Sequence, residues 1–262
     1  MSKKGKLDVS VSRNQRQMLG GRLNFAASEA YKLLRTNLMF SIPSNGGKII
    51  GITSALRNEG KSTTSINLAY SIAQTGNKVL LIDADMRLPS LAKLLGIQST
   101  PGLSNLLAGL CNGKEALSES GMLDNLYVIP SGDAPPNPSE LLGSKNMNRL
   151  VELLAQEYDY VIFDLPPITA VSDGLVISKL IHGMIVVVRQ DYCDRRSLAE
   201  TMRQLEFLQV KVLGFVMTRS ESASKGNTKY KKIYGPSYPT GYNQKGAQPL
   251  GVDTKGKDAN HT

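Results

Sequence analysis

A glycine, a lysine and a serine at positions 60–62 have the order and spacing of a loop that binds phosphate. The stretch from Ala55 to Ser62 reads A-L-R-N-E-G-K-S and fits the Walker A pattern, with Ala55 where glycine is usual. Backbone N–H groups of such a loop wrap a phosphate, and the positive end of the following helix adds to the attraction. Lys61 can place its ammonium near the β- and γ-phosphates, and the Ser62 hydroxyl can bind magnesium. The pattern predicts that ATP and Mg²⁺ are held by Asn58, Glu59, Gly60, Lys61, Ser62 and Thr63.

Three aspartates stand at the ends of two apolar runs further along the chain. The run L-L-I-D-A-D-M-R contains Asp83, Asp85 and Arg87, and V-I-F-D ends in Asp164, as in a Walker B strand. The carboxyl ends of parallel strands meet at one edge of a sheet, where ligands bind. We therefore predict that the three aspartates converge beside Ser62. Acids in that position can hold magnesium, directly or through water, or accept a hydroxyl proton.

The elements that must position these residues follow an α/β pattern. Short runs rich in Val, Ile and Leu predict strands at 48–53, 78–83, 125–130, 158–164, 183–189 and 210–218. Helical patterns lie at 62–75, 139–157, 172–181 and 195–208. Near-continuous apolar strands separated by helices predict a mostly parallel sheet with helices on both faces. The phosphate loop follows the first strand and opens a helix, which is the context that a P-loop requires.

Another helix is expected at 28–39, before the first strand, with Ser28 as its N-cap. Glu29, Lys32 and Arg35 form a charged stripe along it. The spacing alone favours a solvated helix face with i,i+3 pairing.

Charge divides the chain into three parts. Residues 1–22 hold six Lys or Arg against one Asp, residues 219–262 hold eight against three acids, and the remaining 196 residues sum to −1. We expect flexible basic termini at 1–22 and 219–262 around an ATP-binding domain at 23–218. Basic tails of this kind are more often solvated arms than readers of nucleic acid, so no specific nucleic-acid partner is predicted. No secretory signal or membrane span is expected, and two cysteines without metal-ligand spacing suit a reducing cytosol.

The polar carboxyl-terminal segment carries a periodic set of tyrosines. Tyr230, Tyr234, Tyr238 and Tyr242 recur every four residues, but the glycines and prolines between them argue against a helix. Exposed tyrosines in a flexible segment have no packing role. We therefore interpret them as hydroxyl acceptors for a kinase site.

In combination, T-S-x-x-x-x-E-G-K-S-T, L-L-I-D-A-D-M-R and V-I-F-D-x-P-P resemble the motifs of the bacterial tyrosine kinases of capsule and exopolysaccharide systems. The D-x-D-x-R element resembles the second Walker motif of that family, and E-A-Y-K-L-L-R resembles its subunit-contact helix. The resemblance implies a P-loop NTPase fold in which Lys61, Asp83, Asp85 and Asp164 are catalytic. It also implies that Ser62 and the aspartates 83 and 164 bind magnesium, and that Arg87 helps to order the ATP site.

The resemblance further implies a ring of subunits in which one subunit phosphorylates the tyrosine cluster of its neighbour. The stripe of Glu29, Lys32 and Arg35 would lie at the subunit interface, and Asp83 would activate the tyrosine hydroxyl. A transmembrane chain-length-regulator-like protein, here a separate chain, would activate the kinase at the inner face of the cell membrane. Other protein tyrosines would be further substrates, and polysaccharide synthesis would be the regulated process.

Three positions depart from the family pattern. Lys32 replaces an arginine and loses the planar bidentate fork, while Asn58 stands where glycine is frequent and tolerates unusual backbone angles. Thr218 and Arg219 occupy the place of an asparagine that contacts adenine, which puts base recognition there in doubt.

Two other functions fit parts of the pattern. A partitioning or septum-positioning ATPase shares the fold, but those proteins typically carry a second lysine early in the P-loop, where this chain has Leu56. The tyrosine cluster would also have no role in such a switch. A non-enzymatic, nucleotide-gated interaction module is disfavoured by the intact Lys61, Asp83 and Asp164.

Overall fold

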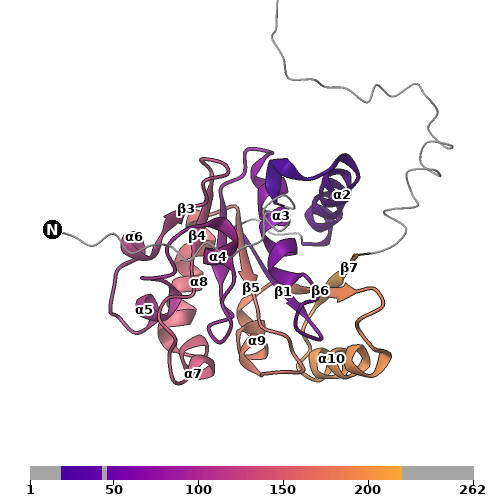
Figure 1. Ribbon diagram of the computed structural model, residues 1–262. Helices are drawn as coiled ribbons and strands as arrows, with labels where there is room; N and C mark the ends of the chain where they lie inside the picture. Colours follow the sequence, from indigo (N-terminus) through magenta and orange to yellow (C-terminus); the bar gives the residue numbers. More distant parts are fainter. Residues whose placement is uncertain (1–18, 43–45, 220–262) are drawn as a thin grey trace, which may run out of the picture. The chain divides into compact units, whose positions relative to one another are not determined.

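The computed structural model describes residues 19–42 and 46–219 of the chain (Figure 1). Most of the two predicted flexible termini, and all four tyrosines of the 230–242 cluster, lie outside these residues. The strands are β1 Lys48–Ser54, β2 Val79–Asp83, β3 Ser118–Glu119, β4 Leu126–Ile129, β5 Tyr160–Asp164, β6 Gly183–Arg189 and β7 Val212–Thr218. The helices are η1 Gly20–Arg22, α2 Phe25–Ser41, α3 Lys61–Ala73, α4 Leu91–Leu95, α5 Leu103–Leu107, α6 Gly113–Ala116, α7 Pro138–Leu142, α8 Lys145–Glu157, α9 Asp173–Val176, η2 Ile177–Leu180 and α10 Arg195–Phe207.

The strands form one sheet in the order β3-β4-β2-β5-β1-β6-β7. The pairing is parallel throughout, except that β3 runs antiparallel to β4. β1 therefore lies between β5 and β6, and β2 lies on the other side of β5. In this register Asp83 pairs with Asp164, so the two predicted acidic strand ends are direct neighbours. The mostly parallel sheet predicted from the sequence is confirmed.

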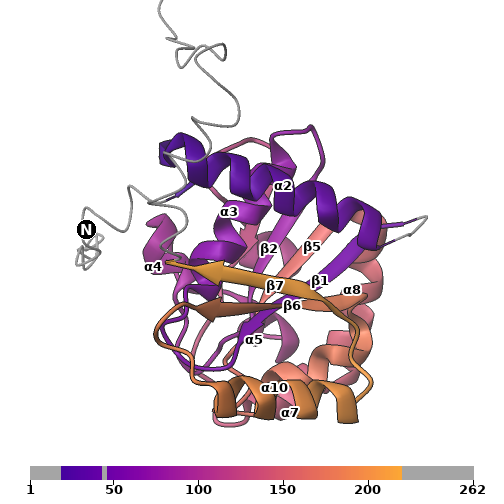
Figure 2. The ribbon, with the colours of Figure 1, turned by 90° about the vertical axis from the view of Figure 1, so that its right-hand side faces the viewer.

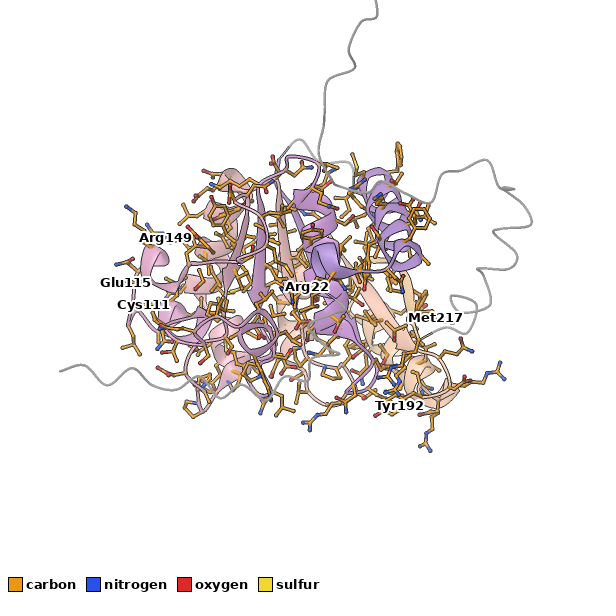
Figure 3. The ribbon with its side chains drawn as sticks, turned by 45° about the horizontal axis from the view of Figure 1, so that its top comes forward. Arg22, Cys111, Glu115, Arg149, Tyr192 and Met217 are labelled. Atoms are coloured by element: carbon orange, nitrogen blue, oxygen red, sulfur yellow. The ribbon has the colours of Figure 1, made fainter. Side chains whose placement is uncertain are left out.

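Two apolar cores lie on opposite faces of the sheet, because successive strand residues point to opposite sides. Ile50 and Ile52 pack with α2, α3 and α4, whereas Ile49 belongs to the core formed with α5 and α7–α10. In Figure 2, α2 and α3 lie on one side of the sheet and α10 on the other. Figure 3 shows Glu115 and Met217 on opposite sides of the described part of the chain; Glu115 lies in α6, just before β3, and Met217 lies in β7. Both faces are covered, which explains why the central strands read as continuous apolar runs.

The helix bounds differ from the prediction in three places. The predicted helix at 172–181 is the short α-helix α9 followed by the 3-10 helix η2. The segment 139–157 forms two helices rather than one, because the chain leaves α7 at Gly143 and the Ser144 side chain caps the start of α8. The first long helix begins at Phe25, with Asn24 rather than Ser28 as its N-cap. The short elements α4, α5, α6 and β3 were not predicted, since each is too brief to show a periodic pattern.

None of the helices in the described ranges combines the length and the hydropathy that a membrane span needs.

Candidate active site

The phosphate loop joins β1 to α3 and depends on two left-handed backbone positions. Gly60 has φ +93° at the N-cap of α3, and Asn58 has φ +61°. The left-handed backbone angle favours glycine at this position, and a Cβ atom on Gly60 would also lie in tight contact with Cγ2 of Thr218, at 3.3 Å. Asparagine is one of the few other residues that adopt such angles readily, which accounts for Asn58. The loop thus opens α3 with its first-turn N–H groups available to an anion.

Glu59 connects this loop to β6 and β7 by hydrogen bonds. Its carboxylate is buried and accepts hydrogen bonds from the backbone N–H of Leu56 at 2.6 Å and of Arg189 at 3.2 Å. The Thr218 hydroxyl donates to the Glu59 carbonyl at 2.7 Å. Because its carboxylate and its carbonyl already accept hydrogen bonds within the chain, Glu59 can bind a phosphate only through its backbone N–H. The side chain of Thr218 is therefore turned toward the loop.

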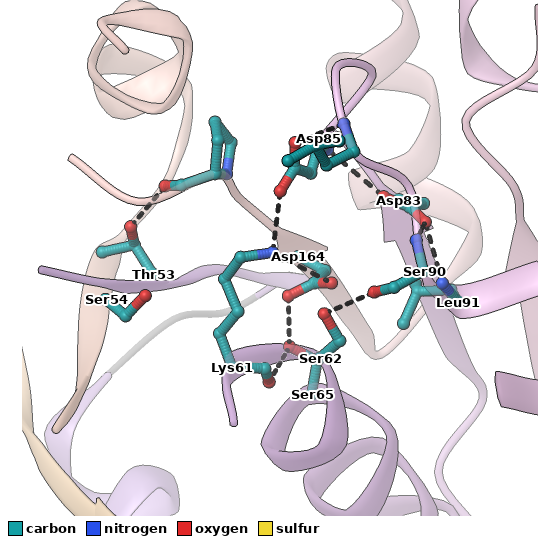
Figure 4. Close-up of polar contacts among 12 residues, drawn as sticks. Thr53, Ser54, Lys61, Ser62, Ser65, Asp83, Asp85, Ser90, Leu91 and Asp164 are labelled. Carbon is teal, nitrogen blue, oxygen red and sulfur yellow. Dashed lines mark hydrogen bonds and ion pairs between the residues drawn. The ribbon is translucent and has the colours of Figure 1, made fainter. Parts of the chain in front are cut away.

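Lys61 lies between two of the predicted aspartates (Figure 4). Its ammonium is 2.9 Å from Oδ2 of Asp85 and 3.8 Å from Oδ2 of Asp164. Burial by itself would lower the pKa of Lys61, but the carboxylates of Asp164, Asp85 and Asp83 outweigh it and raise that pKa. The lysine is therefore held in its charged form at the edge of the sheet where the loop, β2 and β5 meet.

Asp164 is fully buried at the end of β5. Its Oδ1 atom accepts from the Ser65 hydroxyl at 3.0 Å, whereas its Oδ2 atom has no hydrogen-bond partner among the described residues. Burial raises the pKa of Asp164, while Lys61 and the hydroxyls of Ser62 and Ser65 oppose that shift. A buried carboxylate oxygen without a hydrogen bond, next to a serine hydroxyl, is an arrangement that a cation would complete.

Asp83 is also fully buried and is held by the loop that follows β2. Its Oδ2 atom accepts from the backbone N–H groups of Ser90 and Leu91, at 3.0 Å each. Burial, followed by the neighbouring charge of Asp164, raises the pKa of Asp83 to about 7. The Ser90 hydroxyl in turn donates to the Ser62 hydroxyl at 2.7 Å. Sequence reasoning missed both Ser65 and Ser90.

Arg87 lies on the same loop, but its guanidinium points to a different partner. Its Nε atom is 2.7 Å from Oδ2 of Asp173, at the start of α9, and the Ser139 hydroxyl also donates to that carboxylate. Asp173 is buried, whereas the Arg87 side chain is 45% exposed. The structure thus brings the lysine, the serine and the three aspartates together, and it places Arg87 in a separate ion pair beside them.

The charged stripe of α2 makes contacts within the chain. Lys32 pairs with Glu29 at 2.7 Å, and both side chains are about half exposed. Arg35 instead donates to the backbone carbonyl of Ser71 in α3 at 2.6 Å. Arg35 therefore helps to hold α2 on α3, and the Glu29–Lys32 pair faces solvent.

The oxygen atoms at this site suit magnesium better than a metal ion whose ligands all come from the protein. Within the described residues, no group of three or more His, Cys, Asp and Glu side chains is placed to enclose a metal ion. The Ser62 hydroxyl and the carboxylates of Asp83 and Asp164 supply hard oxygen atoms, which suit magnesium. Mg²⁺ is typically bound by one or two such groups, with water and substrate phosphates completing its shell.

A glycine-lysine-serine turn between a central parallel strand and a helix, next to acidic strand ends, defines a P-loop nucleotide-binding fold. Residues 47–211 match the family model described as "AAA domain". The tyrosine-protein kinase YwqD of Bacillus subtilis is 40% identical over 190 residues, which are 72% of this chain and 80% of YwqD.

Solved structures agree with this relationship. The kinase domain of the Escherichia coli tyrosine kinase ETK is 36% identical, with a TM-score of 0.69 over 74% of this chain and 77% of that domain. The chimerical protein CapA2B2 is 31% identical, with a TM-score of 0.74 over 80% of this chain and 91% of that protein. The chain belongs to the family of bacterial tyrosine-protein kinases, and its enzymatic activity is that of a protein-tyrosine kinase.

Proposed function

We propose that this kinase transfers the γ-phosphoryl group of magnesium-bound ATP to tyrosines of its own carboxyl-terminal cluster and thereby regulates capsule or exopolysaccharide synthesis. The observation that carries the proposal is the convergence of Lys61, Ser62, Asp83, Asp85 and Asp164 at one sheet edge, directly at the N-terminus of α3. The acceptors would be Tyr230, Tyr234, Tyr238 and Tyr242, with tyrosines of other proteins as further substrates.

In the proposed reaction the tyrosine oxygen forms a bond to the γ-phosphorus, and the bond to the β,γ-bridging oxygen breaks to release ADP. Asp83 accepts the proton that the tyrosine hydroxyl loses. Lys61 leaves Asp85 and contacts the phosphate oxygens instead. Its positive charge there offsets the negative charge of the reacting group. Backbone N–H groups of Asn58–Thr63 fix the phosphates in position. A magnesium ion held by Ser62, Asp83 and Asp164 would add charge neutralisation.

Arg87 has a more indirect part in this proposal. Its ion pair with Asp173 fixes the loop that carries Asp85, so Arg87 would order the ATP site without touching the nucleotide.

We further propose that phosphorylation occurs between subunits of a ring, with α2 at the interface. Support comes from the exposed apolar side chains of α2, among them Phe25, Leu33 and Phe40, which are 78%, 62% and 85% exposed. Such side chains next to the exposed Glu29–Lys32 pair are typical of a contact surface. The activator is proposed, on the family resemblance, to be a separate transmembrane chain-length-regulator-like protein that recruits the kinase to the inner face of the cell membrane.

The reaction is tested by incubating the full chain with magnesium and γ-labelled ATP and mapping the label by mass spectrometry. We expect phosphotyrosine at positions 230–242, which is lost when all four tyrosines are changed to phenylalanine. Mixing Lys61→Met protein with a four-phenylalanine variant tests transfer in trans, because label on the Lys61→Met chain must come from the other chain. If labelled phosphate is released with no labelled tyrosine, with and without the activator's cytoplasmic segment, the ATPase alternative replaces the proposal.

The interface is tested by light scattering. Because Arg35 also holds α3, the informative variant is Glu29→Ala/Lys32→Ala, with Arg35→Ala measured separately for its effect on thermal stability. The proposal expects Glu29→Ala/Lys32→Ala to lower the oligomer mass while the melting temperature stays unchanged. An unaltered mass would contradict it.

A further inference from the structure

Ser90 contacts two residues that are proposed to bind magnesium. Its hydroxyl donates to the Ser62 hydroxyl at 2.7 Å, and its backbone N–H donates to Oδ2 of Asp83 at 3.0 Å (Figure 4). Ser62 lies in the first turn of α3, and Asp83 ends β2. Ser90 therefore joins two sequence segments whose oxygens must have a fixed separation to share one ion.

The Ser90 hydroxyl does not have the role that its position in the chain predicts. Ser90 is the residue that precedes α4, where a serine side chain normally accepts a hydrogen bond from the helix backbone. In this structure the Ser90 side chain makes no capping bond to α4. The hydroxyl is turned to Ser62 instead, so its contact serves the site rather than the helix.

The direction of this hydrogen bond leaves Ser62 able to bind a cation. A hydroxyl oxygen has one hydrogen and two lone pairs. The hydrogen bond from Ser90 occupies one lone pair of Ser62. The second lone pair of Ser62 is then available to a cation.

We propose that Ser90 is a positioning residue for magnesium, which orients the Ser62 hydroxyl and holds the carboxylate of Asp83 at the same time. This inference rests on the proposed site for magnesium and nucleotide. Its consequence is specific: loss of the Ser90 hydroxyl weakens the magnesium-dependent part of nucleotide binding and leaves the fold intact. Removal of an outer partner of a metal ligand typically costs about 10- to 100-fold in metal affinity or activity.

The test is calorimetric titration of ADP into the full chain, with magnesium and with EDTA, for four proteins. They are the wild type, Ser90→Ala, Ser90→Thr and the control Ser178→Ala. The Ser178 hydroxyl, in η2, donates to the carbonyl of Leu175 in α9. In Ser90→Ala we expect the gain in ADP affinity on adding magnesium to fall by about 10-fold. ADP binding in EDTA and the thermal midpoint of the free protein stay at the wild-type values. Ser90→Thr, which retains a hydroxyl, and Ser178→Ala keep the full gain.

Three results would overturn the inference. In the first, Ser90→Ala keeps the whole magnesium-dependent gain. In the second, Ser90→Thr loses as much as Ser90→Ala, so that the hydroxyl is not responsible. In the third, Ser90→Ala loses its thermal stability together with ADP binding in EDTA, which makes the role purely structural. A wild-type protein whose ADP affinity does not depend on magnesium would refute the proposed magnesium site itself, and this distinguishes the two failures.

Discussion

Lys61→Met, the standard substitution for abolishing phosphoryl transfer, is expected to destabilise the nucleotide-free protein as well. The Lys61 and Asp85 side chains are only 11% and 5% exposed. Removal of one partner leaves the other charge buried and uncompensated, and breaking such a pair costs about 3–5 kcal/mol. Because Asp85 keeps a hydrogen bond from the backbone N–H of Leu88, we take the lower figure, about 3 kcal/mol. In a domain of this size that corresponds to a melting temperature lower by about 6–12 °C.

The assay is urea unfolding without nucleotide or magnesium, with the free energy of unfolding obtained by linear extrapolation. The double variant Lys61→Met/Asp85→Asn no longer carries the uncompensated Asp85 charge. Relative to Lys61→Met, its free energy of unfolding is expected to rise by about 1–2 kcal/mol. Two independent sites would not show such a coupling. Arg203→Met is the matched control, because it breaks an ion pair with Glu200 whose side chains are 67% and 46% exposed. It should cost less than about 1 kcal/mol.

A Lys61→Met protein that unfolds within about 1 kcal/mol of the wild type would refute the reasoning, since the ion pair would then contribute like an exposed one. If the prediction holds, activity assays on this variant must be run well below its lowered melting temperature. Otherwise loss of folded protein would be mistaken for loss of catalysis.

Three further predictions concern the loop, a thiol and a helix cap. Gly60→Ala forces a side chain into a left-handed backbone position beside β7 and should lower stability by about 1–3 kcal/mol, measured by urea unfolding, and weaken ADP binding. Burial and the neighbouring Glu59 carboxylate raise the pKa of Cys193 to about 12. Its alkylation at pH 8, followed by mass spectrometry, should therefore be at least about 100-fold slower than that of an unperturbed cysteine peptide and should accelerate steadily as the pH rises. Asn24→Ala should cost about 1 kcal/mol, because Asn24 caps α2, whereas Ser28→Ala should be nearly neutral; equal losses in the two variants would contradict the observed helix start.

The parts of the site that follow from sheet geometry were predictable from the sequence. A strand-loop-helix context places Lys61 and Ser62 at the N-terminus of α3, and parallel pairing brings strand-end acids to one edge. Asp83 and Asp164 are register partners for that reason. Both inferences need only the period of the apolar residues and the position of polar residues at the ends of the runs.

The partners supplied by loops were not predictable in the same way. Ser65, Ser90 and Asp173 are single polar residues in a loop or a helix turn, and no spacing distinguishes them from solvated ones. The roles of Ser90 and Asp173 depend on the path of residues 84–90 and on where α9 begins, and the role of Ser65 depends on how α3 packs against the end of β5. The burial of Glu59 likewise depends on β6 and β7 reaching the phosphate loop, which the local sequence around Glu59 does not encode. The four-residue tyrosine period stays a prediction, because those residues lie outside the described ranges.

The charges at the site bear on the form in which the nucleotide binds. The residues Asp83, Asp85 and Asp164 are 0%, 4% and 0% exposed, and the one buried ammonium that faces them in the described part of the chain is that of Lys61. Arg87, on the loop that follows β2, is also positively charged, but it is paired with Asp173. Free ATP would therefore bring further negative charge next to a cluster in which three aspartates face one lysine. A divalent cation removes that repulsion, so the same acids that disfavour free ATP favour its magnesium complex.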